Sequence, residues 1–450
     1  MNQNIPLPTL MAQELAHVDL CVLGGSCTGV FAAVRAARLG MKVALVEKQN
    51  SFGGVATQAL VTVWHSLMDM ADTRQIIAGL TYEVLQRLER RDAVDYHPES
   101  RAVTYVMNTE ELKIELDSLV TAEKNITPFL HTTYCAPLAD DDGTLMGVVV
   151  AGKSGLGIVY AERFIDATGD GDLVRDLPCP TALADDPQPP TPGMKISGMS
   201  RISEMDLVQL IGEHAEEVGM NPDRGWGTFI PGAPDLFYFA PAHVYHVDCS
   251  DTRSLTYAEI ESRRQIRSVM DLLRKYYPQE HPTLVGVGSY IGGRESRHVR
   301  CLYRLTESDI LCGKRIPDAI ANGTYPCDIH TNNDLGITWK YLDGTEVYRR
   351  NGFPDAVRSW LAPGQKAPDF YQVPLKTIIP QGVSNVLVAG RMVDADQSAF
   401  GAIRVMVNLN QLGEAAGVAA YNSLNQNLPV SQIDAAKVRH LLASGGSVIL

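Results

Sequence analysis

The sequence predicts an α/β fold in which a parallel sheet is assembled from both ends of the chain, with a second, α+β unit inserted between them. Near the N-terminus a buried strand, a helix and another buried strand follow one another within about thirty residues, the length of a βαβ unit. Near the C-terminus a further buried strand and a long helix follow a middle segment of different pattern. With 450 residues, 45% of them apolar and 20% charged, the chain can bury a large core.

The N-terminal unit begins with the apolar run Val18 to Leu23, which is typical of a buried parallel strand. Small apolar residues then recur at helical spacing from Val30 to Leu39, and Gly40 is a helix C-cap signal. Val43 to Val46 predicts the second buried strand. These three elements predict a βαβ unit.

That turn, Gly24 to Gly29, has glycine at the first and last positions of the dinucleotide-binding pattern G-x-G-x-x-G, with Ser26 at the middle glycine position. The N–H groups of the following helix would face the phosphates. Glu47, directly after the second strand, is placed to accept a hydrogen bond from a ribose hydroxyl. A glycine-rich turn without a ligand is the alternative, but the order strand, turn, helix, strand and acid favours a dinucleotide site.

Segments further along the chain favour FAD over NAD. Gly53-Gly54 and Thr57 follow the ribose acid, where a second loop can lie along the pyrophosphate. Phe164 to Leu173 predicts a strand that ends in Ala-Thr-Gly-Asp-Gly-Asp. Val386 to Ala389 predicts another buried strand, followed by a Gly-Arg turn and a long helix starting near Gly401, whose positive end could stabilise charge on a reduced flavin.

These segments resemble the glutathione-reductase-like flavoproteins, most closely the family of FAD-dependent oxidoreductases. The resemblance also includes Ser254 to Leu273, Gly293 to Arg297 and Tyr325 to His330. It implies a three-layer, Rossmann-like FAD-binding domain with an inserted α+β cap or substrate domain, and a backbone contact from near Tyr134 to adenine. The residues that the motifs and the resemblance together assign to FAD are Gly24, Gly25, Ser26, Cys27, Thr28, Gly29, Glu47, Lys48, Gly53, Gly54, Thr57, Tyr134, Thr168, Gly169, Asp170, Gly390, Arg391, Ala402, Ile403 and Arg404.

The expected division of the chain follows its changes of pattern. Pro128 to Tyr134 is expected as a third parallel strand, and Thr144 to Gly152 with Leu156 to Ile165 as a small antiparallel excursion. The middle of the chain shows antiparallel runs such as Phe237 to Val247 and an amphipathic helix from about Thr256 to Tyr276. The expected parts are 15–175 and 371–425 for the two halves of the FAD-binding domain, 176–370 for the cap, and 426–450 for a C-terminal tail or helix.

Gly286 to Gly292 looks like a second dinucleotide loop and would imply a nicotinamide domain. Dense charge follows it, where an alanine-rich helix should begin, so a glycine-rich strand end is the favoured interpretation.

Arg294, Glu295 and Arg297 are candidate catalytic residues on an expected strand, where alternation puts Glu295 and Arg297 on one face and Arg294 on the other. Because the flavin carries out the redox step, the protein must orient the substrate and move a proton. An arginine supported by an acid could hold a carboxylate or carbonyl group of the substrate. The alternative is a salt-bridge network that braces the cap.

Three further candidates are His330, His65 and Arg404. His330 could exchange a proton near physiological pH, or only bond a neighbouring backbone group. His65 could approach the flavin edge, or belong to a packed aromatic cluster. Arg404 could support an anionic reduced flavin, or have a structural role.

Composition excludes several other classes. Lys and Arg number 39 against 52 Asp and Glu, a net charge of −13 that repels nucleic acids and anionic membranes, so we expect neither partner. The eight cysteines contain no C-x-x-C pair, and His243 and His246 would face opposite ways on an expected strand, so no metal is expected. No apolar stretch reaches membrane length, and no basic and apolar leader is evident, so we expect a cytoplasmic protein.

The sequence thus predicts an FAD-dependent oxidoreductase that exchanges a hydride between flavin N5 and a small organic substrate. It uses a second electron donor or acceptor of unknown kind, and a homo-oligomer is possible. One alternative is a fumarate-reductase-like reductase of activated double bonds. Another is a flavin-carrying electron-transfer subunit of a larger complex, and a third is a non-enzymatic scaffold if Ser26 prevents cofactor binding.

Overall fold

The computed structural model describes residues 11–100, 104–141, 143–220 and 225–450. Residues 1–10, on which the expected absence of a leader depends, lie outside this range. All eight cysteines are described and none forms a disulfide. Across the described ranges, no helix has both the length and the apolar character that a membrane crossing requires.

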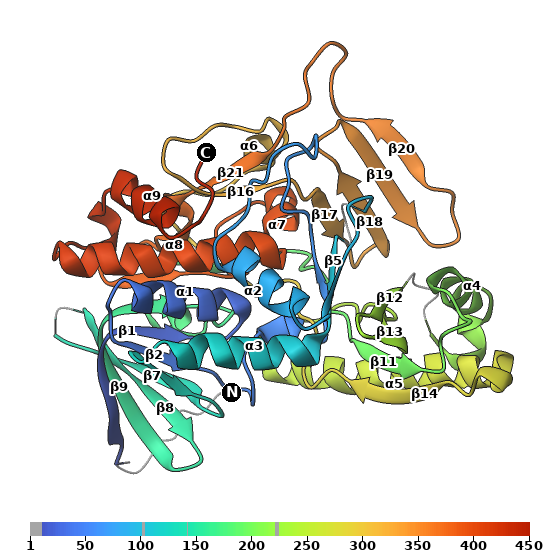
Figure 1. The fold of residues 1–450 in the computed structure, drawn as a ribbon, viewed down its shortest axis with the longest axis horizontal. Coiled ribbons are helices and arrows are strands. Elements are labelled where there is room, and N and C mark those ends of the chain that lie inside the picture. Colours follow the sequence, from blue (N-terminus) through green and yellow to red (C-terminus); the bar gives the residue numbers. More distant parts are fainter. Residues whose placement is uncertain (1–10, 101–103, 142, 221–224) are drawn as a thin grey trace.

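The main sheet combines strands from both ends of the chain, as predicted (Figure 1). Seven strands of the described chain form it in the order β6-β2-β1-β9-β8-β7, and β22 pairs with the second half of β9. The pairs β2–β6, β1–β2, β1–β9 and β9–β22 are parallel, whereas β7–β8 and β8–β9 are antiparallel. The strands are β1 (Gln13–Leu23), β2 (Val43–Val46), β6 (Ile126–Phe129), β7 (Thr133–Ala139), β8 (Leu145–Gly152), β9 (Gly155–Asp166) and β22 (Val386–Val388).

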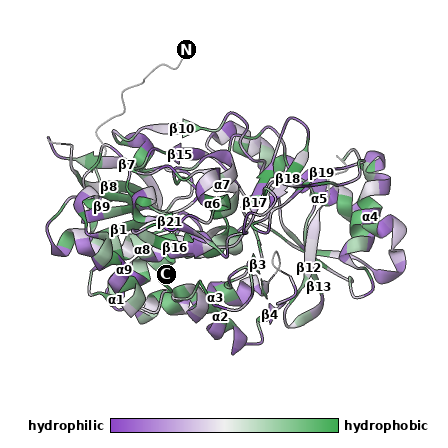
Figure 2. Ribbon diagram, turned by 90° about the horizontal axis from the view of Figure 1, so that it is seen from above, coloured by the Kyte–Doolittle hydropathy of each residue, from purple (hydrophilic) through white to green (hydrophobic). Residues whose placement is uncertain are grey.

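Helices α1 and α8 pack closely on one face of this sheet. A Cβ on Gly413 would lie 2.1 Å from the Thr28 carbonyl oxygen, and one on Gly417 would lie 2.3 Å from that of Ala32, so only glycine permits this approach. Figure 2 shows apolar and polar colouring alternating along the strands and helices of this part. The helices around the sheet are α1 (Cys27–Arg38), α2 (Leu80–Glu89), α3 (Thr109–Ala122), α8 (Met406–Asn425) and α9 (Ala435–Ser444).

Alternating residues of β1 face two separate cores. Leu20 and Val22 are fully buried and pack toward the helices. Cys21 and Leu23 face the opposite side, where β8 and β15 contribute apolar side chains. A strand with both faces buried is typical of a parallel sheet with covered faces, so the chain has the expected layered α/β architecture.

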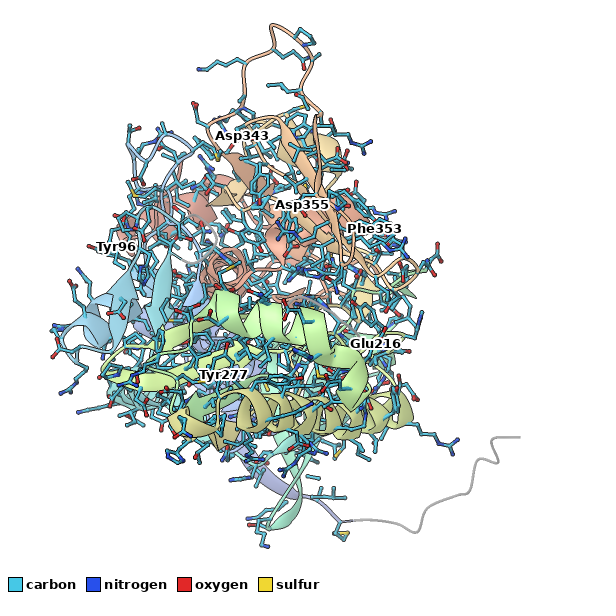
Figure 3. All side chains as sticks on the ribbon, turned by 90° about the vertical axis from the view of Figure 1, so that its right-hand side faces the viewer. Tyr96, Glu216, Tyr277, Asp343, Phe353 and Asp355 are labelled. Carbon is cyan, nitrogen blue, oxygen red and sulfur yellow. The ribbon has the colours of Figure 1, made fainter. Side chains whose placement is uncertain are left out.

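Two other four-stranded antiparallel sheets are built within the described part of residues 194–359, inside the range expected for the cap. Figure 3 views them from the side, with Glu216 and Tyr277 by the lower sheet and its helices, and Phe353 and Asp355 on the upper one. The lower sheet has β11 (Met194–Ser197), β12 (Trp226–Ile230), β13 (Ala233–Ala240) and β14 (Thr283–Val287), with α4 (Glu204–His214) and α5 (Thr252–Tyr276). The upper sheet has β17 (Cys327–His330), β18 (Gly336–Lys340), β19 (Thr345–Arg350) and β20 (Ala356–Ser359).

Shorter elements connect these parts. No helix follows β14 until α6, which agrees with a glycine-rich strand end rather than a second dinucleotide loop. The remaining strands and α-helices are β3 (Val63–Trp64), β4 (Val94–Tyr96), β5 (Tyr105–Met107), β10 (Thr181–Leu183), β15 (Arg297–Val299), β16 (Ala319–Gly323), β21 (Tyr371–Pro374), α6 (Glu307–Leu311) and α7 (Gln397–Ile403). Single 3₁₀ turns span Gly54–Ala56, Val174–Asp176, Ala215–Val218, Pro278–Glu280, Leu375–Ile378 and Val430–Gln432.

The expected third parallel strand, Pro128 to Tyr134, is wrong in extent. The parallel strand β6 ends earlier because the chain turns at His131, which has a φ of 51°, and Tyr134 belongs to the antiparallel β7. The expected excursion over residues 144–165 is confirmed as the hairpin β8–β9, but β9 is also the direct neighbour of β1 in the main sheet.

The expected strand over Phe237 to Val247 is too long. β13 ends at Ala240, and the next residue is Pro241, which has no N–H to donate to a sheet. His243 and His246 therefore lie in irregular chain, so the expectation that they alternate on a strand is wrong. Among the described residues, no group of three or more His, Cys, Asp or Glu is arranged to hold a metal ion.

The single long helix expected to start near Gly401 is two helices. α7 begins after its N-cap Asp396 and contains Gly401, and a break at Arg404 precedes α8, which begins at Met406. Gly401 is required inside α7 because a Cβ there would lie 2.7 Å from the backbone oxygen of Asp328. The break puts a helix N-terminus and Arg404 at the same point of the fold.

Candidate functional site

The carboxyl ends of the parallel strands meet at one edge of the main sheet, where a cavity lies between their loops. We call it the cofactor cavity. Ligands of α/β folds bind at this edge, because the loops after the strands converge there. Fourteen residues assigned to FAD from the sequence line it: Gly24, Ser26, Cys27, Thr28, Glu47, Lys48, Gly53, Gly54, Thr168, Gly169, Asp170, Gly390, Arg391 and Arg404.

The glycine turn after β1 is held by backbone contacts that leave no space for side chains. Gly24 has a φ of 101°, and a Cβ there would lie 2.3 Å from the Ala167 carbonyl oxygen. A Cβ on Gly29 would lie 1.8 Å from the Gly24 carbonyl oxygen. Gly24 therefore forms the cavity wall directly, whereas Gly29 allows the helix to pack against the turn.

Replacing Gly24 with Ala is expected to weaken FAD binding by about 100-fold or more, because the new methyl group displaces the loop at Ala167. The measurement is fluorescence titration of the flavin-free protein with FAD. Gly40→Ala is the matched control, because Gly40 has a similar φ of 98° but open space around it and lies outside the cavity. Equal affinities of the two variants would contradict this role for Gly24.

Ser26, at the middle glycine position, is accommodated by a second glycine loop. Its side chain caps α1 by accepting a hydrogen bond from the Gly29 N–H at 3.4 Å. Gly54, with a φ of 56°, lies directly against it, and a Cβ there would be 2.7 Å from the Ser26 Cβ. Ser26 thus lines the cavity at the N-terminus of α1 without closing it, so the residues present still fit a pyrophosphate.

Glu47 is a buried carboxylate at the end of β2. One oxygen accepts from the Gly25 N–H at 2.6 Å and the other from the Gln49 N–H at 2.8 Å. Burial raises its pKa, although these two hydrogen bonds favour the ionised form. It lines the cavity in the position expected for a ribose contact.

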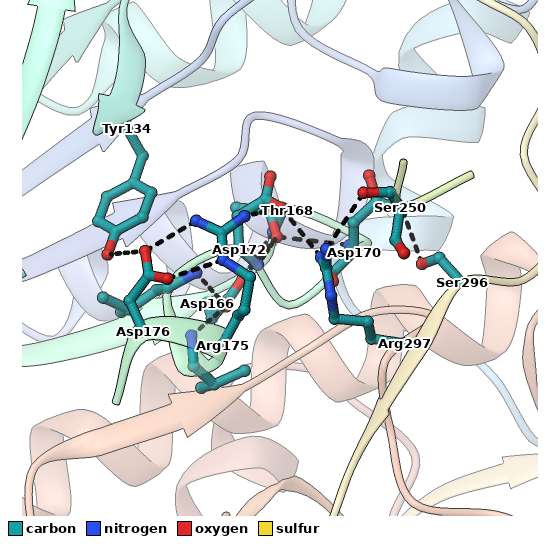
Figure 4. A network of polar contacts seen from close by, with 12 residues as sticks. Tyr134, Asp166, Thr168, Asp170, Asp172, Arg175, Asp176, Ser250, Ser296 and Arg297 are labelled. Atoms are coloured by element: carbon teal, nitrogen blue, oxygen red, sulfur yellow. Dashed lines mark hydrogen bonds and ion pairs between the residues drawn. The ribbon is translucent and has the colours of Figure 1, made fainter. Parts of the chain in front are cut away.

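The loop after β9 is organised by Asp166, a buried acid that is not among the predicted site residues (Figure 4). Asp166 accepts hydrogen bonds from the Thr168 hydroxyl at 2.7 Å and from the N–H groups of Leu173 and Val174 at 2.9 and 3.1 Å. Burial raises the pKa of Asp166 to about 6. This network fixes Thr168 to Asp170, which line the cavity.

Three cationic side chains line the cofactor cavity, namely Lys48, Arg391 and Arg404, and the first two fit a negatively charged ligand away from the second cavity. Lys48 lies over the ring of Tyr290, 5.3 Å from its centre. Arg391 donates to Asp170 at 3.2 Å and to the Gly293 carbonyl, and a Cβ on Gly169 would lie 2.7 Å from the Arg391 guanidinium. Together with the N-terminus of α1, these cations would balance the charge of a pyrophosphate.

Six residues assigned to FAD do not line the cavity. Thr57 instead supports the second glycine loop, with its hydroxyl donating to the Phe52 carbonyl at 2.7 Å. Tyr134 points its hydroxyl to Asp176 at 3.1 Å. The others, beside Thr57 and Tyr134, are Gly25, Gly29, Ala402 and Ile403.

A second, larger cavity of about 400 Å³ adjoins the first and shares Val55, Arg391, Arg404 and Met406 with it. We call it the second cavity. Its walls come from the main-sheet loops and from both antiparallel sheets, and they are rich in aromatic groups. These include His65, Trp226, Tyr238, His243, Tyr325, His330 and Trp339.

Asp328, His330 and Arg404 form a buried charged cluster in the wall of the second cavity. His330 Nε2 lies 3.0 Å from Asp328 Oδ1, and Arg404 donates to Asp328 Oδ2 at 2.8 Å. Tyr325 also donates its hydroxyl to Asp328 Oδ2, at 2.9 Å. Asp328 was not predicted as a site residue, although it lies within the Tyr325–His330 motif.

The two titratable members of the cluster, Asp328 and His330, are in different charge states at neutral pH. Burial lowers the pKa of His330 to about 3, even though Asp328 opposes this effect. Burial alone would raise the pKa of Asp328, but His330 and Arg404 hold it well below its usual range. At neutral pH the cluster is therefore a carboxylate beside a neutral imidazole.

Arg294, Glu295 and Arg297 are not arranged as expected, because the strand β15 begins only at Arg297. Arg294 lines the second cavity and donates to the Pro189 carbonyl at 2.7 Å. Glu295 is 1% exposed and bonds His298 at 2.7 Å, outside both cavities. Glu295 therefore lies with structural partners.

Arg297 also points away from the second cavity. It donates to the Asp170 carbonyl at 3.1 Å and to the Ser250 carbonyl at 3.2 Å (Figure 4). This agrees with the bracing network that was the alternative to substrate binding. Of the three residues, only Arg294 reaches the second cavity.

His65 and Cys27 lie in the walls of the two cavities. The ring of His65 packs against Tyr325 with their centres 4.1 Å apart, so it both lines the second cavity and belongs to an aromatic cluster. The Cys27 thiol donates to the Gly53 carbonyl at 3.6 Å, and burial raises its pKa to about 12. Cys27 therefore acts as a packed wall residue rather than as a nucleophile.

Comparison of the sequence with models of protein families finds a family that matches most of the chain. A family model described as FAD dependent oxidoreductase matches residues 19–442, from β1 into α9. The mitochondrial dihydrolipoyl dehydrogenase of Schizosaccharomyces pombe is 32% identical over 85 residues, which cover 16% of this chain and 17% of that enzyme. The chain thus matches less than a fifth of the length of that relative.

Solved structures are similar over most of the chain but at low identity. A geranylgeranyl bacteriochlorophyll reductase-like protein from Thermoplasma acidophilum has a TM-score of 0.46 and 10% identity, covering 95% of this chain and 83% of its own. The p-nitrophenol 4-monooxygenase of Pseudomonas putida has a TM-score of 0.42 and 9% identity, with coverages of 96% and 82%. The myxobacterial chondrochloren halogenase has values of 0.44 and 12%, with coverages of 96% and 80%. Similarity at these TM-scores and sequence identities does not indicate which reaction this chain catalyses.

Proposed function

Because this chain belongs to the family of FAD-dependent oxidoreductases, we propose that it oxidises a small organic substrate held in the second cavity. FAD is the cofactor, and when bound it supplies the hydride acceptor at flavin N5. The glycine turn, Glu47 and the loop after β9 also support a place in the glutathione-reductase-like superfamily, which we infer from these motifs.

The observation that carries the proposal is the Asp328–His330 pair in the wall of the second cavity. His330 Nε2 lies 3.0 Å from Asp328 Oδ1, and His330 Nδ1 has no hydrogen-bond partner among the described residues. An ionised carboxylate this close to Nε2 would favour the tautomer of His330 that carries its proton on Nε2. Nδ1 would then be the unprotonated ring nitrogen, whose lone pair can accept a proton.

His330 is therefore suited to accept a proton from the substrate. Removing a hydride from an alcohol or amine leaves a proton to be taken from its O–H or N–H group, and a base within hydrogen-bond reach of that group lowers the barrier. The imidazolium that forms would be stabilised by Asp328, which Arg404 and Tyr325 keep oriented. Because burial lowers the pKa of His330, the imidazole is neutral at neutral pH and carries no extra proton to donate to a double bond.

The other residues of the second cavity would orient the substrate and exclude water. Arg294 enters the wall from the loop before β15 and would bind a carboxylate or carbonyl group. Trp226, Tyr238 and Trp339 supply flat apolar surface. The N-terminus of α8 and Arg404 lie where the two cavities join, so they would stabilise negative charge on the reduced flavin.

The test is anaerobic mixing of the FAD-loaded protein with a panel of hydroxy acids, other alcohols and amines. We expect at least one of these compounds to bleach the absorbance of the oxidised flavin at about 450 nm, with a rate that saturates as the concentration of the compound rises. If none does, and the chemically reduced protein is instead reoxidised by an unsaturated acid, the double-bond reductase is supported. Redox exchange with neither class, but with a partner protein, would support an electron-transfer subunit.

A further inference from the structure

Asn410, on α8, is a buried amide in the wall of the cofactor cavity. Its side chain is 0% exposed, and neither Nδ2 nor Oδ1 has a hydrogen-bond partner among the described residues. Buried amides in folded proteins are almost always hydrogen-bonded, because an unpaired polar group destabilises the fold. An amide with both ends unpaired beside a ligand cavity therefore points to a ligand.

A neighbour of the same type shows that the helix does not force this state. Asn408, two residues earlier and 2% exposed, donates to the Tyr371 hydroxyl at 2.8 Å and to the Ala402 carbonyl at 3.0 Å. Asn408 is outside both cavities. The Oδ1 of Asn408 is also unpaired among the described residues, but its Nδ2 is bonded, so Asn410 differs in lining the cofactor cavity and in having both ends of its amide unpaired.

The position of Asn410 along the cavity indicates which part of FAD it would meet. Met406, one helical turn earlier, lines both cavities and so marks the flavin end. Gly413, three residues later, packs against the Thr28 carbonyl at the N-terminus of α1, which marks the phosphate end. Asn410 lies between these two points, where the ribityl chain joins the flavin to the pyrophosphate.

We propose that Asn410 binds the ribityl hydroxyls of FAD. Hydroxyls both donate and accept, so they can satisfy Nδ2 and Oδ1 together. A pyrophosphate offers acceptors only and would leave Oδ1 unpaired against an anion, so it is the poorer match. This assignment rests on FAD binding and is independent of the reaction proposed above.

The test replaces Asn410 with Leu, which has a similar size and no hydrogen-bonding group. We expect the flavin-free Asn410→Leu protein to melt at the same temperature as the wild type or higher, because two unpaired polar atoms are removed. Its Kd for FAD, from fluorescence titration, should rise by about 10- to 100-fold. If the Asn410 amide only fills space, the Kd for FAD should not change.

Asn422→Leu is the matched control, because Asn422 is also buried on α8 but lies outside both cavities. Its Kd for FAD should stay within about twofold of the wild type. ADP, which lacks the ribityl chain and the flavin, serves as the second ligand. Asn410→Leu should leave the Kd for ADP unchanged.

An unchanged Kd for FAD would overturn the proposal, and so would an equal loss of affinity for FAD and ADP, which would put Asn410 at the pyrophosphate. If Asn410→Leu does not fold, Asn410→Ser keeps one hydroxyl and should give an intermediate loss for FAD alone. A Ser variant with wild-type affinity for FAD would likewise contradict the assignment.

Discussion

Replacing His330 with Gln is expected to lower kcat/KM for the oxidised substrate by about 10²- to 10⁴-fold, while FAD remains bound. The glutamine keeps much of the shape of the imidazole but cannot take up a proton. His330 lies in the second cavity and not among the residues that line the cofactor cavity, so the flavin spectrum should be unchanged. The measurement is steady-state kinetics with a substrate found by anaerobic reduction.

His298→Gln is the matched control for this prediction. His298 is also buried and pairs with an acid, Glu295, at 2.7 Å, but it lies outside both cavities. Its kcat/KM should change by less than about tenfold. If His330→Gln and His298→Gln lose activity equally, His330 is not the base.

The pH dependence of the wild-type enzyme belongs to the same prediction. Burial lowers the pKa of His330 from 6.5 to about 3, so the imidazole is already a neutral base throughout the range above pH 4 or so. The kcat/KM profile should therefore show no acid limb near pH 6.5. A limb at that pH that disappears in His330→Gln would mean that His330 titrates as an exposed histidine does.

Replacing Arg35 with Met is expected to destabilise the protein by about 3–5 kcal/mol, because it leaves a carboxylate buried without its cation. Arg35, on α1, donates to Glu414 on α8, and the two side chains are 4% and 1% exposed. Burial raises the pKa of Glu414, and Arg35 opposes this. The measurement is urea denaturation followed by circular dichroism.

Arg38→Met, on the same helix, is the control. Arg38 pairs with Glu83 and Glu123 but is 33% exposed, so its loss should cost less than about 1 kcal/mol. Adding Glu414→Gln to Arg35→Met should recover part of the lost stability, because the neutral amide is easier to bury. Equal destabilisation by Arg35→Met and Arg38→Met would contradict the prediction.

The α/β architecture could be predicted because its signals are local. Val43 to Val46 and Val386 to Ala389 are short apolar runs, and Val18 to Leu23 is apolar apart from Asp19. All three strands are confirmed, although β1 begins earlier, at Gln13. The helix around Gly401 was misjudged because the break at Arg404 depends on contact with Asp328 from a distant strand. No window of local sequence contains that contact.

Some site residues could be predicted from local sequence and others could not, because the others depend on contacts between distant segments. The glycine turns and Glu47 lie next to strand ends, so sequence order alone places them at one edge of the sheet. The assignment of Glu295 and Arg297 depended on a strand that begins only at Arg297. Asp328 lies within the Tyr325–His330 motif but had no predicted role, and Asn410 belongs to no motif; only the fold shows that Asp328 lies beside His330 and that Asn410 lines the cofactor cavity.

Because the main sheet includes β22 and is covered by α8, its folding cannot finish until these two elements have been synthesised. β22 and α8 pair with β9 and α1, which lie more than two hundred residues earlier. The alanine-rich face of α1 therefore lacks its α8 partner until α8 has been synthesised, and an uncovered apolar surface favours aggregation or chaperone binding. The closely packed glycines Gly413 and Gly417 would then be the contact that ends this vulnerable period.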